Sequence, residues 1–261
     1  MTIYQVDAFT KEPFRGNPAG VCLLDAPADV KWMQAVAREM NLSETAFLYP
    51  VGDAFHLRWF TPAVEVDLCG HATLASTHVL HETGRMNEGR EVRFETRSGT
   101  LIATKNGGRI EMDFPATPAR EVAIPDGLFE AIGFTSPYVA RNATDYLVVA
   151  KDADRVRACL PDFGRLKAIT ERGVIITARD DSGGYDFISR FFAPAAGIDE
   201  DPVTGSTHCT LGPYWGSVLE KSILRAFQAS VRGGEMEVEL SGDRVLLRGY
   251  AVTVMRCELI V

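Results

Sequence analysis

The hydrophobic and polar residues of this chain follow two periods, one typical of helices and one typical of strands. Within residues 29–40, apolar side chains recur three or four positions apart, at Val30, Met33, Ala37 and Met40. That spacing places them on one face of an α-helix. Two further helices are expected to begin at glycine turns, one from Gly70 to about Gly84 and one after Gly205.

Short apolar segments between these helices predict strands. In the first half they are residues 21–24, 45–49, 55–60, 92–94, 99–104 and 109–114. In the second half they are residues 146–150, 174–178, 187–192, 235–240 and 244–247, with a helix expected at residues 153–160. The Asn106-Gly107 turn is typical of a tight hairpin, and we expect most strand pairs to be antiparallel.

The chain repeats itself once. Residues 55–62 resemble residues 187–194, with an offset of 190 minus 58, or 132, between their arginines. A glycine-rich hairpin around Arg109 resembles the one around Arg244, with an offset of 244 minus 109, or 135. Two ordered matches with nearly the same offset indicate an internal duplication.

This repeat predicts an α+β fold made of two pseudo-symmetric half-domains, each a mostly antiparallel sheet curled around a central helix. The proline-rich residues 115–118 are expected to link them. We assign residues 1–116 plus 250–261 to the N-terminal half-domain and residues 117–249 to the C-terminal one.

Composition and charge narrow the range of functions. The 261 residues carry a formal net charge of -8, which disfavours nucleic acid as a partner because phosphate binding needs a basic face. The five cysteines form no CxxC pair, so neither a zinc ribbon nor a disulfide framework is expected. No segment is typical of a signal peptide or a membrane span, and we expect a cytoplasmic protein without membrane association.

Two glycine turns that open helices are partners in the repeat. Gly70 and Gly205 are separated by 205 minus 70, again 135 positions. Glycine lets a backbone approach a ligand closely, and the N–H groups at a helix start favour an anion. The sequence alone leaves open whether these turns bind a carboxylate or are only structural.

Five ordered segments resemble the motifs of the PhzF-like family of phenazine biosynthesis. They are Gly16-Asn17-Pro18-Ala19-Gly20-Val21, Asn41-Leu42-Ser43-Glu44-Thr45-Ala46-Phe47, Cys69-Gly70-His71-Ala72-Thr73, Glu200-Asp201-Pro202-Val203-Thr204-Gly205-Ser206 and Arg232-Gly233-Gly234. The resemblance covers nearly the whole chain. It implies the diaminopimelate-epimerase-like fold, with the active site in the cleft between the two half-domains. It also implies a homodimer, a role in biosynthesis and an isomerisation that needs no cofactor.

The resemblance also implies roles for individual residues. Glu44 is expected to carry a proton between carbons of a small carboxylic acid, a dihydro-hydroxyanthranilate in the phenazine enzyme of the family. His71 and Asp201 are expected to act with it as polar catalytic partners. The expected ligands of the substrate are Asn17, Ser43, Gly70, Gly205 and Ser206.

Other interpretations stay open at this point. Related racemases use two thiols, but Cys69 has Thr204 as its repeat partner, so a one-thiol reaction is the form that remains. A module that binds a carboxylic acid or a protein without turnover is a second alternative. The five histidines lack the spacing of common zinc sites, so no metal is expected.

Overall fold

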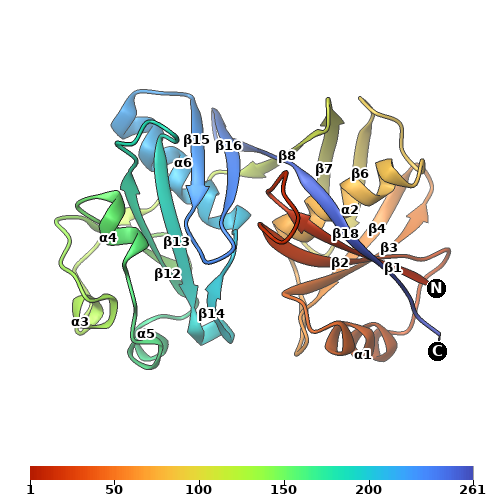
Figure 1. The fold of residues 1–261 in the computed structure, drawn as a ribbon, viewed down its shortest axis with the longest axis horizontal. Coiled ribbons are helices and arrows are strands. Elements are labelled where there is room, and N and C mark those ends of the chain that lie inside the picture. The colour runs from red at the N-terminus through yellow and green to blue at the C-terminus, as the bar shows by residue number, and fades with distance from the viewer. Residues whose placement is uncertain (261) are drawn as a thin grey trace. The chain divides into compact units, whose positions relative to one another are not determined.

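The computed structural model of the chain describes residues 1–260, which divide into two compact units (Figure 1). One unit contains Met1–Phe114 and the segment from Leu246 onward, and the other is Pro115–Val245. The expected boundaries were 1–116 with 250–261, and 117–249. No described helix is both long enough and apolar enough to cross a membrane.

Unit 1 is a mixed sheet with a buried helix. Its elements are β1 (Thr2–Ala8), β2 (Asn17–Leu23), α1 (Val30–Met40), β3 (Glu44–Val51), β4 (Ala54–Phe60), β5 (Glu65–Val66), α2 (Gly70–Glu82), β6 (Glu91–Thr96), β7 (Gly99–Asn106), β8 (Arg109–Pro115) and β18 (Ala251–Glu258). Strand β2 is parallel to β3, β3 antiparallel to β4, β4 parallel to β6, and β6 antiparallel to β7.

Unit 2 repeats this order. Its elements are β9 (Arg120–Glu121), α3 (Leu128–Ile132), β10 (Val139–Arg141), β11 (Asp145–Val149), α4 (Ala153–Arg157), α5 (Phe163–Ile169), β12 (Gly173–Arg179), β13 (Phe187–Ala193), the 3-10 helix η1 (Pro194–Ala196), β14 (Ile198–Asp201), α6 (Gly205–Leu219), β15 (Ile223–Gln228), β16 (Gly234–Ser241) and β17 (Arg244–Gly249), which runs across the boundary of the units. Its pairs β11–β12, β12–β13, β13–β15 and β15–β16 are parallel, antiparallel, parallel and antiparallel. The expected α+β fold with a repeated half-domain is therefore confirmed.

Helix α2 is buried on nearly every side, as a helix wrapped by a sheet must be. Nine of its 13 residues are buried, and its hydroxyl groups satisfy themselves within the helix. The Thr73, Ser76 and Thr77 hydroxyls donate to backbone carbonyls one turn earlier, at 2.6, 2.7 and 2.9 Å. These internal bonds let polar side chains lie in the core without unpaired donors.

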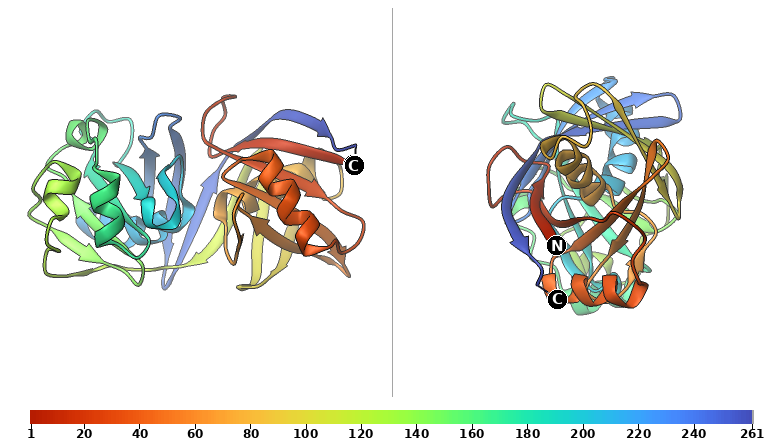
Figure 2. Two further views of the ribbon diagram at one scale, coloured as in Figure 1. Left: turned by 90° about the horizontal axis from the view of Figure 1, so that it is seen from below. Right: turned by 90° about the vertical axis from the view of Figure 1, so that its right-hand side faces the viewer.

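Helix α1 lies on the other face of the unit 1 sheet, as Figure 2 shows. Met33, Val36 and Ala37 are buried there in an apolar cluster with Phe47 and Phe60 of the sheet. The predicted apolar face was right for Met33 and Ala37 but wrong for Val30, which is 45% exposed. Val30 is the first residue of the helix, where the chain has only begun to approach the sheet.

Several elements were not expected from the sequence. Strands β1 and β18 pair with each other from Thr2↔Glu258 to Ala8↔Ala251, so β18 finds this partner at the opposite end of the chain, while β1 also pairs with β2. Helices α3 and α5 are only 5 and 7 residues long, too short for a periodic pattern. The helix expected at residues 153–160 is shorter in the structure, ending at Arg157.

Candidate active site

The first motif places Asn17 in the interior of unit 1. Gly16 has a φ of 66°, and a Cβ there would lie 2.1 Å from the Ala8 carbonyl oxygen. Only glycine tolerates both this backbone conformation and this close approach. The turn delivers Asn17 to the start of β2, opposite Ala8 of β1, where Asn17 is completely buried.

The second motif brings Ser43 and Glu44 close to the start of β2, where Asn17 lies. Helix α1 ends at Met40, and its C-cap Asn41, whose backbone is left-handed (φ 50°), turns the chain toward β3. Glu44 opens β3 in parallel register with Ala19 of β2. Its side chain is only 12% exposed, so this carboxylate differs from the solvated surface glutamates that are the usual case.

His71 joins these residues in one hydrogen-bonded network. Its Nε2 atom lies 3.2 Å from Oε2 of Glu44, and its Nδ1 atom lies 3.3 Å from Nδ2 of Asn17. The Ser43 hydroxyl donates to Oδ1 of Asn17 at 3.1 Å. Four of the eight predicted site residues thus form a continuous chain of contacts within unit 1.

Burial decides the charge of this network. It lowers the pKa of His71 to about 3, so the imidazole is neutral near pH 7. The contact with Glu44 is therefore a hydrogen bond rather than an ion pair. Ser43 fixes the Asn17 amide with Nδ2 toward Nδ1 of His71, so Nδ1 accepts and Nε2–H donates to Glu44. The opposite tautomer would aim a lone pair at the carboxylate.

Cys69 precedes α2 and lies against the same histidine. Its Sγ atom is 3.5 Å from Nδ1 of His71 and 4.0 Å from Nε2. As the N-cap of α2, Cys69 makes no side-chain hydrogen bond to the first-turn amides. Gly70 is the first residue of the helix, so the expected position of this glycine at a helix start is correct.

Glu44, Cys69 and His71 are also the residues with which this chain could hold a metal ion. Among the described residues, they offer ligand atoms that all lie within 4.8 Å of one another. A thiolate, an imidazole and a carboxylate are ordinary zinc ligands. However, Nδ1 of His71 accepts from Asn17 and Nε2–H donates to Glu44, so binding a metal would require this network to rearrange.

In unit 2, Asp201 is held by two other side chains. The Thr204 hydroxyl donates to Oδ2 of Asp201 in a short hydrogen bond. Gln228, which is 1% exposed, donates from Nε2 to the Asp201 carbonyl at 2.7 Å and to the Thr204 hydroxyl oxygen at 3.2 Å. At the position that corresponds to Cys69 in the repeat, Thr204 therefore uses its hydroxyl to orient a carboxylate.

Gly205 and Ser206 begin α6, in the place that Gly70 and His71 occupy on α2. The Thr204 N-cap makes no side-chain hydrogen bond to the first-turn amides. The Ser206 hydroxyl accepts a hydrogen bond from Arg172, 3.2 Å away. Both helices thus present a glycine and backbone amides that their N-cap side chains do not occupy.

Each predicted site residue therefore lies at an identifiable position within its own unit. Sequence reasoning missed Gln228, Arg172 and Asp145. These three lie outside the five motifs, and no local pattern marks them, because their partners are 24 to 34 positions away in the sequence.

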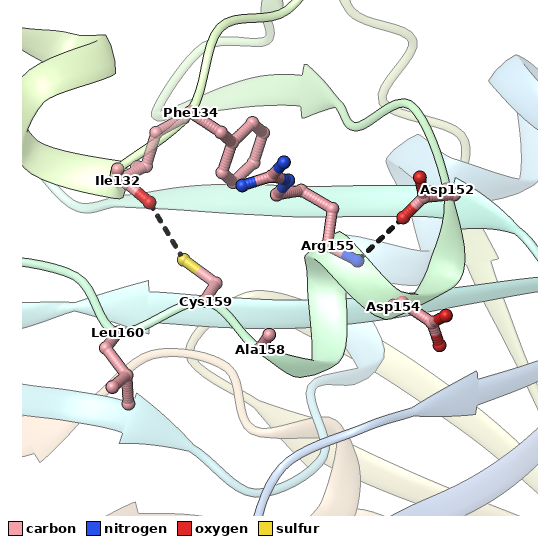
Figure 3. A pocket seen from close by; sticks show the side chains of 9 residues that line it. Ile132, Phe134, Asp152, Asp154, Arg155, Ala158, Cys159 and Leu160 are labelled. Carbon is pink, nitrogen blue, oxygen red and sulfur yellow. Dashed lines mark hydrogen bonds between the residues drawn. The ribbon is translucent and has the colours of Figure 1, made fainter.

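A hollow in unit 2 lies away from these residues. It has a volume of about 480 Å³ and is lined by residues of α3, α4 and the segments beside them, including Phe134, Arg155 and Leu160 (Figure 3). Cys159 in its wall donates to the Ile132 carbonyl at 3.3 Å, and burial raises the pKa of this thiol to about 11. The hollow contains no predicted site residue and no activated nucleophile.

Known proteins resemble this chain over its full length. A family model described as "Phenazine biosynthesis-like protein" matches residues 6–257. A Halalkalibacterium halodurans protein named as an uncharacterized isomerase is 52% identical over 259 residues, which cover 99% of this chain and 98% of that protein.

Solved structures agree with that assignment. A PhzF family protein from Enterococcus faecalis superposes with a TM-score of 0.96 at 41% identity, covering 100% of this chain and 99% of that one. A predicted epimerase from Pseudomonas aeruginosa gives a TM-score of 0.74 at 22% identity, covering 100% and 99% of the two chains, and shows the shared fold.

Proposed function

This chain belongs to the phenazine biosynthesis-like family and is an isomerase, and we propose that it moves a proton between two carbons of a small unsaturated or amino carboxylic acid. Glu44 is the acid and base of that reaction. The observation that carries this proposal is the hydrogen bond from neutral His71 to the nearly buried Glu44 carboxylate, 3.2 Å long.

The proton transfer balances without an oxidant or a cofactor. Glu44 accepts a proton from one carbon of the substrate, and the electrons of that C–H bond enter the conjugated system. The protonated Glu44 then returns the proton to a second carbon, and the double bond shifts between them. A carboxylate can do both steps if it is held in a site with little water, as general acid–base catalysis requires.

His71 supports this cycle without itself storing the proton. With a pKa of about 3, its imidazole stays neutral and keeps donating Nε2–H to Glu44. This donor fixes the direction of the carboxylate. Asn17 and Ser43 hold the histidine in the tautomer that this role needs.

The substrate carboxylate is assigned to the helix starts. Gly70 in unit 1, and Gly205 with Ser206 in unit 2, supply backbone amides, a hydroxyl and the positive ends of two helix dipoles. Asp201, oriented by Thr204, is the polar partner from unit 2. That both units serve one substrate follows from the family resemblance, not from the geometry of either unit.

A one-thiol racemase is the second candidate, because the Sγ atom of Cys69 lies 3.5 Å from His71. The Thr204 hydroxyl, however, is already bonded to Asp201 and Gln228, so it is not free to serve as a second base. That the protein is a cytoplasmic homodimer, takes part in biosynthesis and binds no nucleic acid remains a prediction from its charge and from the resemblance.

Deuterium exchange tests the assignment of Glu44. We expect wild-type protein to introduce deuterium from heavy water into a dihydro-hydroxyanthranilate. Proton NMR measures this exchange. Glu44→Gln keeps the size of the side chain but removes the base, and should slow exchange by about a hundredfold or more. A normal exchange rate in this variant would exclude Glu44 as the proton carrier.

The chain offers a matched control. Glu82 also contacts a histidine, with Oε2 3.4 Å from Nε2 of His78, but its side chain is 44% exposed. Glu82→Gln should leave the exchange rate unchanged. Cys69→Ala should keep most of the activity, whereas complete loss with folding and binding intact would favour the racemase instead.

A further inference from the structure

An ion pair between a buried aspartate and a partly exposed arginine lies beside the start of α6. Asp145 is completely buried, and its two carboxylate oxygens accept from Nε (2.6 Å) and Nη2 of Arg172. The third nitrogen of the guanidinium, Nη1, donates to the Ser206 hydroxyl oxygen at 3.2 Å. Arg172 thus connects a buried carboxylate to a residue already expected to bind the substrate.

The backbone holds this arginine in place. Gly173, the next residue, pairs with Asp145 in the parallel β11–β12 register. A Cβ at Gly173 would lie 2.4 Å from the Phe192 carbonyl oxygen, so β12 approaches its neighbour as closely as glycine allows. The guanidinium also lies over the Phe191 ring, 5.2 Å from its centroid. Asp145, Ser206 and the Phe191 ring therefore fix the direction of the guanidinium from three sides.

Arg172 also sets the direction of the Ser206 hydroxyl group. A hydroxyl has one hydrogen to donate and two lone pairs to accept with. In Ser206 one lone pair is used by Arg172, because a guanidinium can only donate. Among the described residues 1–260, Arg172 is the one hydrogen-bond partner of the Ser206 hydroxyl. The hydrogen of this hydroxyl group therefore has no acceptor among those residues.

We propose that Asp145 and Arg172 are positioning residues for the substrate carboxylate. Asp145 orients Arg172, Arg172 occupies an acceptor site of Ser206, and the Ser206 O–H then donates to the carboxylate. This inference rests on the proposed function, which places the carboxylate at the start of α6. It adds that Asp145 and Arg172, which lie outside the five motifs, favour a ligand that accepts a hydrogen bond from the Ser206 hydroxyl.

The charge balance supports positioning rather than simple attraction. The positive charge of Arg172 is matched by Asp145 on two of its nitrogens, so the pair attracts an anion less than a lone arginine does. What the pair does supply is a rigid donor to Ser206, since bidentate arginine–carboxylate pairs are strongly directional. The pre-aligned hydroxyl does not have to be ordered when the ligand binds.

Calorimetric titration with anthranilate and with its neutral amide, 2-aminobenzamide, tests the proposal. Wild-type protein should bind the acid more tightly. Ser206→Ala should weaken acid binding about ten- to a hundredfold, the effect of one charge-assisted hydrogen bond. Arg172→Met should weaken it about three- to tenfold, since the hydroxyl is still present but no longer aligned.

A double-mutant cycle separates positioning from structure. If Arg172 acts through Ser206, then Arg172→Met should have no further effect in the Ser206→Ala background. Because Arg172→Met leaves Asp145 buried and unpaired, the paired variant Asp145→Asn with Arg172→Met removes that charge and should give the same loss, with melting curves to show folding. Arg58→Met breaks a similar arginine–carboxylate pair in unit 1, and should keep the preference for the acid.

The outcomes distinguish a failure of the carboxylate site from a failure of the positioning role of Arg172. If wild-type protein does not prefer anthranilate to its amide, the carboxylate site fails, and this proposal fails with it. If Ser206→Ala weakens acid binding while Arg172→Met does not, the carboxylate site stands and the positioning role is overturned. Equal losses from Arg172→Met with and without the Ser206 hydroxyl would also overturn it.

Discussion

The two units share a framework and differ in the residues at their helix starts. Each contains the same order of parallel and antiparallel strand pairs and a bidentate arginine–glutamate bridge. Arg58 binds Glu65 at 2.7 and 2.8 Å, and Arg190 binds Glu200 at 2.7 and 2.9 Å. These bridges occupy equivalent places in the repeat, offset by 132 and 135 positions (190 minus 58, 200 minus 65).

The difference lies where each central helix begins. Unit 1 has Cys69 and His71 beside Glu44, a set that can move or hold a proton. Unit 2 has Thr204 and Ser206, which make directional hydrogen bonds to Asp201 and Arg172. In the proposed function, one packing scheme supports acid–base chemistry in one copy and ligand orientation in the other, because the chemistry depends on a few side chains at the helix start.

The largest effect on stability is expected in unit 2. Besides Glu200, Arg190 donates to the carbonyls of Cys159 at 2.6 Å and of Val156 and Arg157 at 3.3 Å. Arg190→Met removes the hydrogen bonds to these carbonyls and leaves Glu200 without this cation, and should lower the free energy of unfolding by about 3–5 kcal/mol, as expected for a broken buried pair. Urea denaturation followed by circular dichroism measures it.

The equivalent change in unit 1 sharpens this comparison. Glu65 keeps a second cation, Nη1 of Arg97 at 3.1 Å, when Arg58 is removed. Arg58→Met should therefore cost about 1.5–3 kcal/mol, the range for hydrogen bonds to charged groups. Equal losses in the two variants would show that the second cation contributes nothing and that the two bridges are equivalent.

A smaller effect concerns pH. Burial lowers the pKa of His71 in unit 1 to about 3 and that of His208 in unit 2 to about 4, from 6.5 in each case. The unfolded chain takes up protons below pH 6.5 while the folded chain does not. Each histidine therefore contributes stability that is fully present above pH 6.5 and is lost progressively as the pH falls toward 3 or 4.

His71→Asn tests how much His71 of unit 1 contributes to this pH dependence of stability. Its free energy of unfolding should change less between pH 7.5 and 5.5 than that of wild-type protein, by about 1.4 kcal/mol, which corresponds to one pKa unit. His208 remains and should preserve its own contribution. An unchanged pH dependence in this variant would mean that His71 is charged or exposed in the folded protein.

The smallest effect is expected from removal of metal. Glu44, Cys69 and His71 could hold an ion by distance, but the ring nitrogens of His71 already have hydrogen-bond partners. Dialysis against a chelator should change neither the melting temperature nor the deuterium exchange rate. A stoichiometric metal in the purified protein, with a loss of stability on chelation, would contradict this expectation and make unit 1 a metal centre.

Local pattern was sufficient where the signal is local. Helix α1 followed from its period and the hairpin of β7 and β8 from its Asn106-Gly107 turn. Strand β18 was missed because its partner β1 lies at the opposite end of the chain. The identity of the motif residues was likewise readable, but not that Thr204 would hold Asp201, since a side chain's partner depends on how the chain folds.

The sequence by itself determined the duplication, the α+β class and the family, because these depend on ordered patterns that survive in one dimension. Only the tertiary structure decided that His71 is neutral, that it donates to Glu44, and that Arg172 reaches Ser206. Those properties arise from burial and from contacts between segments far apart in the chain. Desolvation and hydrogen-bond direction exist only once the chain has folded around these side chains.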